Sequence, residues 1–207
     1  AGSATQVMVG YNRRFAPAVQ ELKKRFADEL PKSINIRVNA GLVPPDHWVN
    51  DPKVGGGRII GEGCHFVDLA MYLAGADITT VSANTLKDAN GLNNSVVINM
   101  EFANGSIATV NYFSNGNKTL GKEYMEVFCG GDVAIIDDFK QMTIYGKTTK
   151  KIKFGGQDKG HAKEVELMLE AIKTGKPLPI SFEDSYLSTL ATLKALESIS
   201  QNRKITL

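Results

Sequence analysis

The chain has 207 residues, of which 43% are hydrophobic and 22% are charged, an ordinary balance for a globular protein. Its net charge of +2 comes from interspersed acids and bases, and no basic run alternates with aromatic residues, which argues against nucleic-acid binding. No apolar stretch has transmembrane length, and two cysteines, Cys64 and Cys129, are too few for a disulfide framework, which favours a reducing cytoplasm.

The first part of the chain predicts a strand, a helix, a second strand and a loop. Residues 5–11 read as the first strand, and residues 16–30 read as a helix because their apolar residues recur at helical spacing. Residues 34–40 alternate strictly between apolar and polar side chains, as a half-buried strand does. A loop with three prolines then leads to the glycines at positions 55–57.

A helix is predicted from these glycines to Gly75, and a polar stripe interrupts its apolar character. The stripe consists of residues three or four apart, namely Arg58, Glu62, His65, Asp68 and Tyr72. Ionisable side chains on an otherwise apolar helix cost desolvation energy, so the stripe either faces water or lines a site. The glycines lack Cβ atoms and would let a ligand approach the backbone at the helix start.

The remainder of the chain predicts consecutive strands followed by two helices. Residues 79–154 read as strands, with a hairpin turn at Asn104-Gly105 and a second turn at residues 130–132. Helices are expected at residues 160–174 and 183–200, and a short strand at 204–207.

Strands in succession favour antiparallel pairing, so we expect one α+β domain spanning residues 1–207. Its large, mostly antiparallel sheet would carry helices on one face and leave the other open. We expect the open face to include Arg37, Asn39, Ala108, Val110 and Tyr112. A half-apolar open face is a candidate interface for a homo-oligomer.

The segment from Gly55 to Asp68 resembles the G-G-G-x-x-x-D-x-G-x-H-x-x-D segment of the Gfo/Idh/MocA oxidoreductases. Residues 9–15 resemble the family's entry to its second domain, and residues 44–52 the stretch before the glycines. Residues 164–179 resemble a late helix that ends in a Gly-Lys-Pro turn. The most similar members are the oxidoreductase halves of bacterial fusions with a zinc-type alcohol dehydrogenase.

The resemblance implies an enzyme that acts on a sugar, cyclitol or related polyol with NAD or NADP. In the family, the nucleotide-binding domain and a Glu-Lys-Pro segment with a catalytic lysine precede the part that matches here. No G-x-G-x-x-G fingerprint occurs in the sequence, because Ile60 stands where a third glycine would follow Gly55 and Gly57. We therefore expect the substrate-binding and oligomerisation domain alone, with no cofactor of its own and no activity by itself.

His65 matches the family's catalytic histidine, and its ordinary pKa suits a proton relay while hydride leaves a hydroxyl-bearing carbon. The residues alone also allow a structural histidine bonded to Asp68 or Glu62. Asp68 would then orient His65 or be a surface charge. The family's site aspartate is replaced by Gly61, so either the adjacent Glu62 reaches the site, or the site works without that acid, or the reaction differs.

Four further residues are candidates for substrate binding. Asn12 and Arg13 match positions where the family lines its pocket, although Arg13 also fits a surface charge beside a helix start. Trp48 is the only tryptophan and would stack on a sugar or nicotinamide face, or else anchor its loop in the core. His161 would cap a helix or reach the pocket.

Two other classes of function have some support in the sequence. Glu62 and His65 form an E-x-x-H pair, but two-metal sites in helix bundles need a second pair, which the sequence lacks, so no metal is expected. The second alternative is a non-catalytic ligand-binding or assembly module of the same fold, which the missing acid at position 61 favours.

Overall fold

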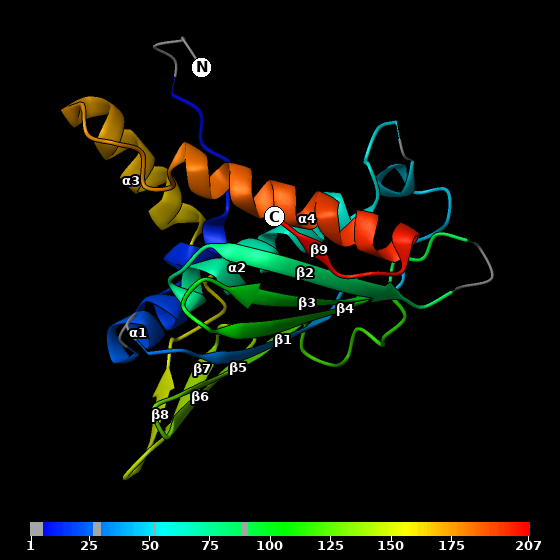
Figure 1. Cartoon of the computed structure of the whole chain (residues 1–207). Helices are drawn as coiled ribbons and strands as arrows, with labels where there is room; N and C mark the ends of the chain where they lie inside the picture. The colour runs from blue at the N-terminus through cyan, green and yellow to red at the C-terminus, as the bar shows by residue number, and fades with distance from the viewer. Residues whose placement is uncertain (1–5, 27–29, 52, 88–90) are drawn as a thin grey trace.

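In the computed structural model, one mixed sheet carries helices on one of its faces (Figure 1). The structure describes residues 6–26, 30–51, 53–87 and 91–207. The strands within this part are β1 (Ser33–Asn39), β2 (Ile78–Thr85), β3 (Val96–Phe102), β4 (Ile107–Phe113), β5 (Glu123–Cys129), β6 (Asp132–Asp137), β7 (Gln141–Tyr145), β8 (Thr149–Lys153) and β9 (Ile205–Thr206). They lie in the order β8-β7-β6-β5-β1-β4-β3-β2-β9. Every pairing is antiparallel except that of β1 with β4, so the α+β prediction with a mostly antiparallel sheet is confirmed.

The helices lie on the upper face of the sheet as drawn in Figure 1. The elements are η1 (Asn12–Phe15), α1 (Pro17–Arg25), η2 (Trp48–Asn50), η3 (Ile59–Gly63), α2 (Cys64–Ala74), α3 (His161–Thr174) and α4 (Phe182–Gln201). Helix α2 packs between the sheet and α4, and α4 also contacts β2. None of the described helices is both long and apolar enough to cross a membrane.

The core lies between the sheet and these helices. Strands β1 and β4 pair in register, with Ile34 opposite Ala108 and Ile36 opposite Val110. All four side chains are buried, and Tyr112 of the same row is fully enclosed. The expectation that Ala108, Val110 and Tyr112 line the open face is therefore wrong. Their row continues the apolar row of β1, and a sheet with one covered face turns such rows toward the helices.

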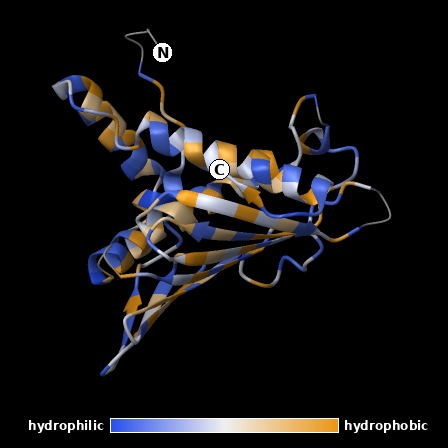
Figure 2. Ribbon diagram, in the orientation of Figure 1, coloured by the Kyte–Doolittle hydropathy of each residue, from blue (hydrophilic) through white to orange (hydrophobic). Residues whose placement is uncertain are grey.

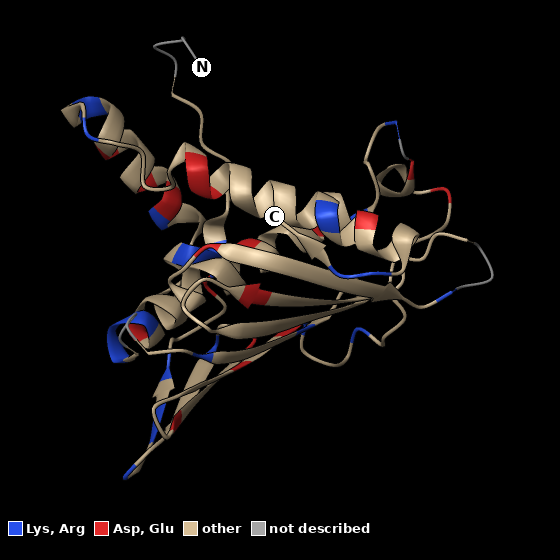
Figure 3. Ribbon diagram, in the orientation of Figure 1, with Lys and Arg blue, Asp and Glu red and all other residues tan. Residues whose placement is uncertain are grey.

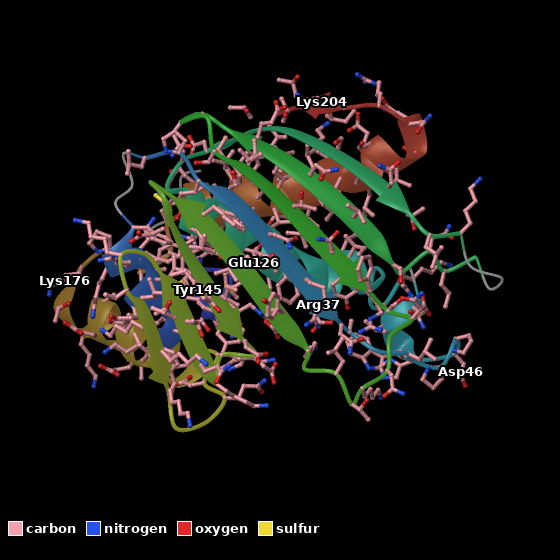
Figure 4. All side chains as sticks on the ribbon, turned by 90° about the horizontal axis from the view of Figure 1, so that it is seen from below. Arg37, Asp46, Glu126, Tyr145, Lys176 and Lys204 are labelled. Carbon is pink, nitrogen blue, oxygen red and sulfur yellow. The ribbon has the colours of Figure 1, made fainter. Side chains whose placement is uncertain are left out.

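No helix of the described part covers the other face of the sheet, which Figure 4 shows from below. Arg37 lies on this face as predicted, and Glu126 and Tyr145 lie there with it (Figure 4). Asn39 shares this side of β1 but is buried, because its amide donates to the carbonyls of Asn117 and Leu120 in the loop after β4.

Most local predictions match the structure. The turn at Asn104-Gly105 joins β3 and β4 as predicted, and the helix after the glycines ends at Ala74 with Gly75 as its C-cap. Apolar and polar residues alternate along the strands, as Figure 2 shows. The strand predicted at residues 5–11 is wrong, because residues 6–11 are irregular and pair with no strand. Helix α1 ends at Arg25 instead of residue 30, and residues 27–29 lie outside the described part.

Candidate functional site

The short turn η1 directs two candidate residues into the protein. Asn12 and Arg13 are both buried, so Arg13 is not a surface charge. Its guanidinium donates two hydrogen bonds to the Glu123 carboxylate, at 2.8 and 3.0 Å, and lies 4.4 Å from the centre of the Phe66 ring. Such a fork onto a carboxylate fixes both partners in orientation.

The loop before α3 completes this cluster. Lys159 donates to Glu123 at 2.6 Å, and the Asn12 amide donates to the Lys159 carbonyl at 2.8 Å. Gly160 follows with φ +87°, and a Cβ there would overlap the backbone at Asn12 and Ala16. A glycine is thus required where this loop crosses η1. The pKa of Glu123 is lowered because the bonds from Arg13 and Lys159 outweigh its burial, which by itself would raise it.

His65 lies in the first turn of α2, beside this cluster. Its ring meets the Tyr11 ring edge to face, with centroids 5.6 Å apart. The buried Nδ1 atom has no hydrogen-bond partner among the described residues. Burial, and then the positive charge of Arg13, lower the pKa of His65 to about 4, against opposing effects of Glu62 and Glu123. The imidazole is therefore neutral at pH 7, and neutral imidazole is the form that accepts a proton.

Glu62 belongs to a π-helical turn, η3, that leads directly into α2. Its carboxylate accepts a hydrogen bond from the Tyr112 hydroxyl at 2.5 Å and another from Lys122, and Arg58 lies 3.5 Å away. These bonds outweigh the effect of burial and lower the pKa of Glu62 to about 2. At neutral pH Glu62 is an ionised electrostatic neighbour of His65 and holds no proton to donate.

Asp68 does not orient His65. It is fully buried, and its carboxylate accepts two hydrogen bonds from Arg14, at 2.8 and 2.6 Å, and one from Ser188 at 3.0 Å. It is also no surface charge, so both roles expected for Asp68 are wrong. Helical spacing places Asp68 correctly on its helix, but the partners that decide its role come from η1 and α4, far away in sequence.

Trp48 and His161 are both exposed, and they lie on different elements, η2 and α3. Trp48 lies in η2 with 62% of its surface exposed and contacts His47, so it does not anchor its loop in the core. His161 is exposed at the first position of α3, and it acts on His65 electrostatically. The cap of α3 is Gly160 rather than His161, so the expected capping role of His161 is wrong.

The first of the glycines before α2, Gly55, packs against the chain's own backbone. A Cβ at Gly55 would lie 2.5 Å from the Val49 Cα and 2.7 Å from the Trp48 carbonyl oxygen. The backbone of η2 therefore occupies the space beside Gly55, and a dinucleotide phosphate does not fit there. Among the residues described, no three histidine, cysteine, aspartate or glutamate side chains gather to hold a metal ion.

Several site residues were not predicted, chiefly Glu123, Lys159 and Lys122. One signal for Glu123 was present, because it begins the inward row of β5 that continues with Met125 and Val127. A charged residue in a buried row needs a partner. Glu164 is another buried carboxylate, and its Oε1 atom has no hydrogen-bond partner within the described residues.

The sequence profile of the GFO/IDH/MocA C-terminal domain matches residues 26–131, just over half of the chain. The chain belongs to the GFO/IDH/MocA family. A comparison with curated protein sequences gives no match.

Solved structures with the same fold include dehydrogenases and another oxidoreductase. A putative myo-inositol dehydrogenase from Sinorhizobium meliloti matches with a TM-score of 0.77 and 22% identity, over 98% of this chain and 65% of its own. UDP-N-acetylglucosamine 3-dehydrogenase from Acidithiobacillus ferrooxidans matches with a TM-score of 0.78 and 21% identity, over 94% of this chain and 62% of its own. Aldose-aldose oxidoreductase from Caulobacter crescentus, complexed with glycerol, matches with a TM-score of 0.79 and 17% identity, over 98% of this chain and 64% of its own. The chain thus spans less than two thirds of each of these proteins.

Proposed function

We propose that this chain is the substrate-binding domain of a longer NAD(P)-dependent oxidoreductase that acts on a sugar, cyclitol or related polyol. The observation that carries the proposal is the state of His65, a half-buried neutral imidazole beside a fixed cluster of polar residues, with an Nδ1 atom that no described residue binds. The nicotinamide cofactor would exchange hydride with a carbon of the substrate and would be held by a domain that precedes this chain.

In this proposal His65 accepts the hydroxyl proton as the alcohol is oxidised, and returns it in the reverse direction. A neutral imidazole is ready for the first step at pH 7, and the ion pair of Arg13 with Glu123 holds the neighbouring charges in place. Asn12 and Lys159 border the same cluster and would contact substrate hydroxyls. The exposed side chains of Trp48 and His161 would also contact the substrate.

The experiment is a cofactor-reduction assay of the longer protein against a panel of sugars and cyclitols, with His65→Ala as the variant. Loss of a general acid–base group lowers kcat by about 10²–10⁴. His47→Asn is the control, because His47 is exposed and Asn retains an acceptor for the Val49 amide. If His65→Ala turns over within a few-fold of the parent, the proposed role of His65 is wrong.

A second function, a non-catalytic ligand-binding or assembly module, is favoured by Gly61. The position carries no carboxylate, and the neighbouring Glu62 is bound by Lys122 and Tyr112. A Cβ at Gly61 would meet its nearest atoms at 3.6 and 3.9 Å, so a side chain fits there. If the longer protein is inactive and Gly61→Asp makes it active on a polyol, the absence of a carboxylate at position 61 explains the inactivity, and the non-catalytic module is supported. If both the parent and Gly61→Asp are active, the module is excluded.

We also propose that the open sheet face joins copies of the protein. Ile107, Phe128 and Tyr145 are about half exposed on strands whose other rows are buried. Between them, Asn35 donates to Glu126 and accepts from Asn111, at 3.0 and 2.9 Å, which fixes polar groups across three strands. Apolar side chains around an ordered polar row suit a subunit interface.

A further inference from the structure

Helix α3 has one face that packs on the domain and one that is charged. Leu167 packs against the small cluster of Tyr11, Phe15 and Ile180, and Ala171 on the same face is buried. The charged face carries two lysines and two glutamates and shows as red and blue segments in Figure 3. The contacts of the packed face tie α3 to η1, and no described residue covers a third face of the helix.

The third face is an apolar stripe of Val165, Met168, Leu169 and Ile172. Their exposed fractions are 54, 36, 49 and 59%. Residues at i, i+3, i+4 and i+7 share one side of a helix, so the four side chains form one continuous surface. In Figure 1, α3 projects at one end of α4, away from the sheet. A helix face of this composition normally packs against another surface.

The N-terminal segment passes close to the first turn of α3. Gly10 faces the first turn of α3, where a Cβ on Gly10 would lie 3.6 Å from Glu164 Oε1. Val7 and Val9, just before it, are 59 and 39% exposed. Figure 1 shows this segment rising past α4 on the helical side, opposite the open sheet face. The described part of the chain therefore begins on the helical side of the molecule and contacts α3 at Gly10.

We propose that the α3 stripe is the docking surface for the nucleotide-binding domain of the longer protein, an inference that rests on the function proposed above. Over a third of each of the three solved structures described above lies outside the part matched by this chain. A domain of that size attached before Gln6 reaches the stripe without crossing the sheet. The open sheet face lies on the opposite side, so it stays free for a second copy.

The first test is hydrogen exchange of peptides covering residues 161–174, compared between the longer protein and the 207-residue chain. Docking requires slower exchange of these amides in the longer protein, by about tenfold or more, because a covered helix opens less often. Equal exchange in the two proteins overturns the proposal, and so does a gene that encodes no preceding domain.

The second test compares two double variants of α3. Leu169→Gln with Ile172→Gln removes apolar area from the stripe, whereas Glu166→Gln with Glu170→Gln makes the same number of changes to glutamine on the charged face. Both pairs should leave the 207-residue chain folded, since all four side chains are exposed. In the longer protein, only the stripe variant should restore fast exchange in α3. Equal exchange in the two variants overturns the proposal.

Other outcomes distinguish docking on the stripe from self-association through the stripe and from the proposed function. If the stripe variant instead converts a self-associated 207-residue chain to monomer and leaves exchange in the longer protein unchanged, the stripe binds a second copy and the proposal is wrong. If α3 is protected but the longer protein reduces neither NAD⁺ nor NADP⁺ with any polyol, the proposed function fails while docking stands. If the longer protein is active and α3 is unprotected, docking fails while the proposed function stands.

Discussion

The Glu62 carboxylate should stabilise the chain in a way that depends on pH, and Glu62→Gln tests this directly. The carboxylate is bound by Tyr112 and Lys122 with Arg58 nearby, and a quarter of its side chain is exposed. Removing the charge leaves Lys122 and Arg58 without their shared acid. The change therefore weakens the contact between η3 and strand β4.

The free energy that the Glu62 carboxylate contributes to stability follows from the shift of its pKa. Burial would raise the pKa of Glu62, but the bonds from Lys122 and Tyr112 lower it from 4.5 to about 2. Each unit of pKa corresponds to about 1.4 kcal/mol, which gives an upper value of roughly 3.5 kcal/mol at pH 7, reduced to about 2 by solvent screening. Because the folded pKa is the lower one, this stability is present above pH 4.5 and is lost as the pH falls toward 2.

The assay is urea unfolding of the 207-residue chain at pH 7 and pH 3. Glu62→Gln should lower the free energy of unfolding by about 2 kcal/mol at pH 7 and by less than half of that at pH 3. Glu126→Gln is the control, since Glu126 lies on the open sheet face and accepts one bond from Asn35. A Glu62→Gln effect that is the same at both pH values, or no larger than that of the control, would refute the reasoning.

Three further outcomes are expected. Asp68→Ala should destabilise the chain by about 3–5 kcal/mol in urea, since it leaves the buried Arg14 without its main partner, whereas Asp184→Ala, on a half-exposed partner of Arg14, should cost much less. Burial raises the pKa of Glu164, so Glu164→Gln should raise the free energy of unfolding at pH 7, a gain that disappears in acid as the carboxyl protonates. Phe128→Lys on the open face should shift the chain toward monomer in analytical ultracentrifugation while Leu193→Lys on α4 does not; a wild type that is monomeric at high concentration would contradict the proposed interface.

Features set by neighbouring residues could be predicted from the sequence. The Asn104-Gly105 turn and the alternation of residues 34–40 each need only a few adjacent positions, and both match the structure. Which way a strand faces depends on pairing with distant strands. The prediction for Ala108, Val110 and Tyr112 chose the wrong face because neither strand alone reveals the parallel pairing of β1 with β4.

The site shows the same division between local and distant information. His65 and Arg13 were found from motifs, but their neighbours were not, because Arg13 and its partner Glu123 are 110 residues apart and Glu62 and Lys122 are 60 apart. The strand predicted at residues 5–11 failed for a related reason. Strand formation needs a partner edge, and the outermost strands here are β8 and β9.

Two adjacent arginines explain how the short turn η1 holds the site in place. Arg13 binds Glu123 of β5, and Arg14 binds Asp68 of α2 and Asp184 of α4, so one turn is tied to the sheet and to two helices. Both guanidinium groups are almost fully buried, which makes each pair costly to break. Arg13 binds Glu123 with its Nε and one terminal nitrogen, and its side chain is only 7% exposed, so a substrate has little access to its remaining N–H groups. Its main role in the proposed function is therefore to fix Glu123 and Lys159 beside His65, and substrate hydroxyls would meet Lys159 first, because its side chain is the more exposed.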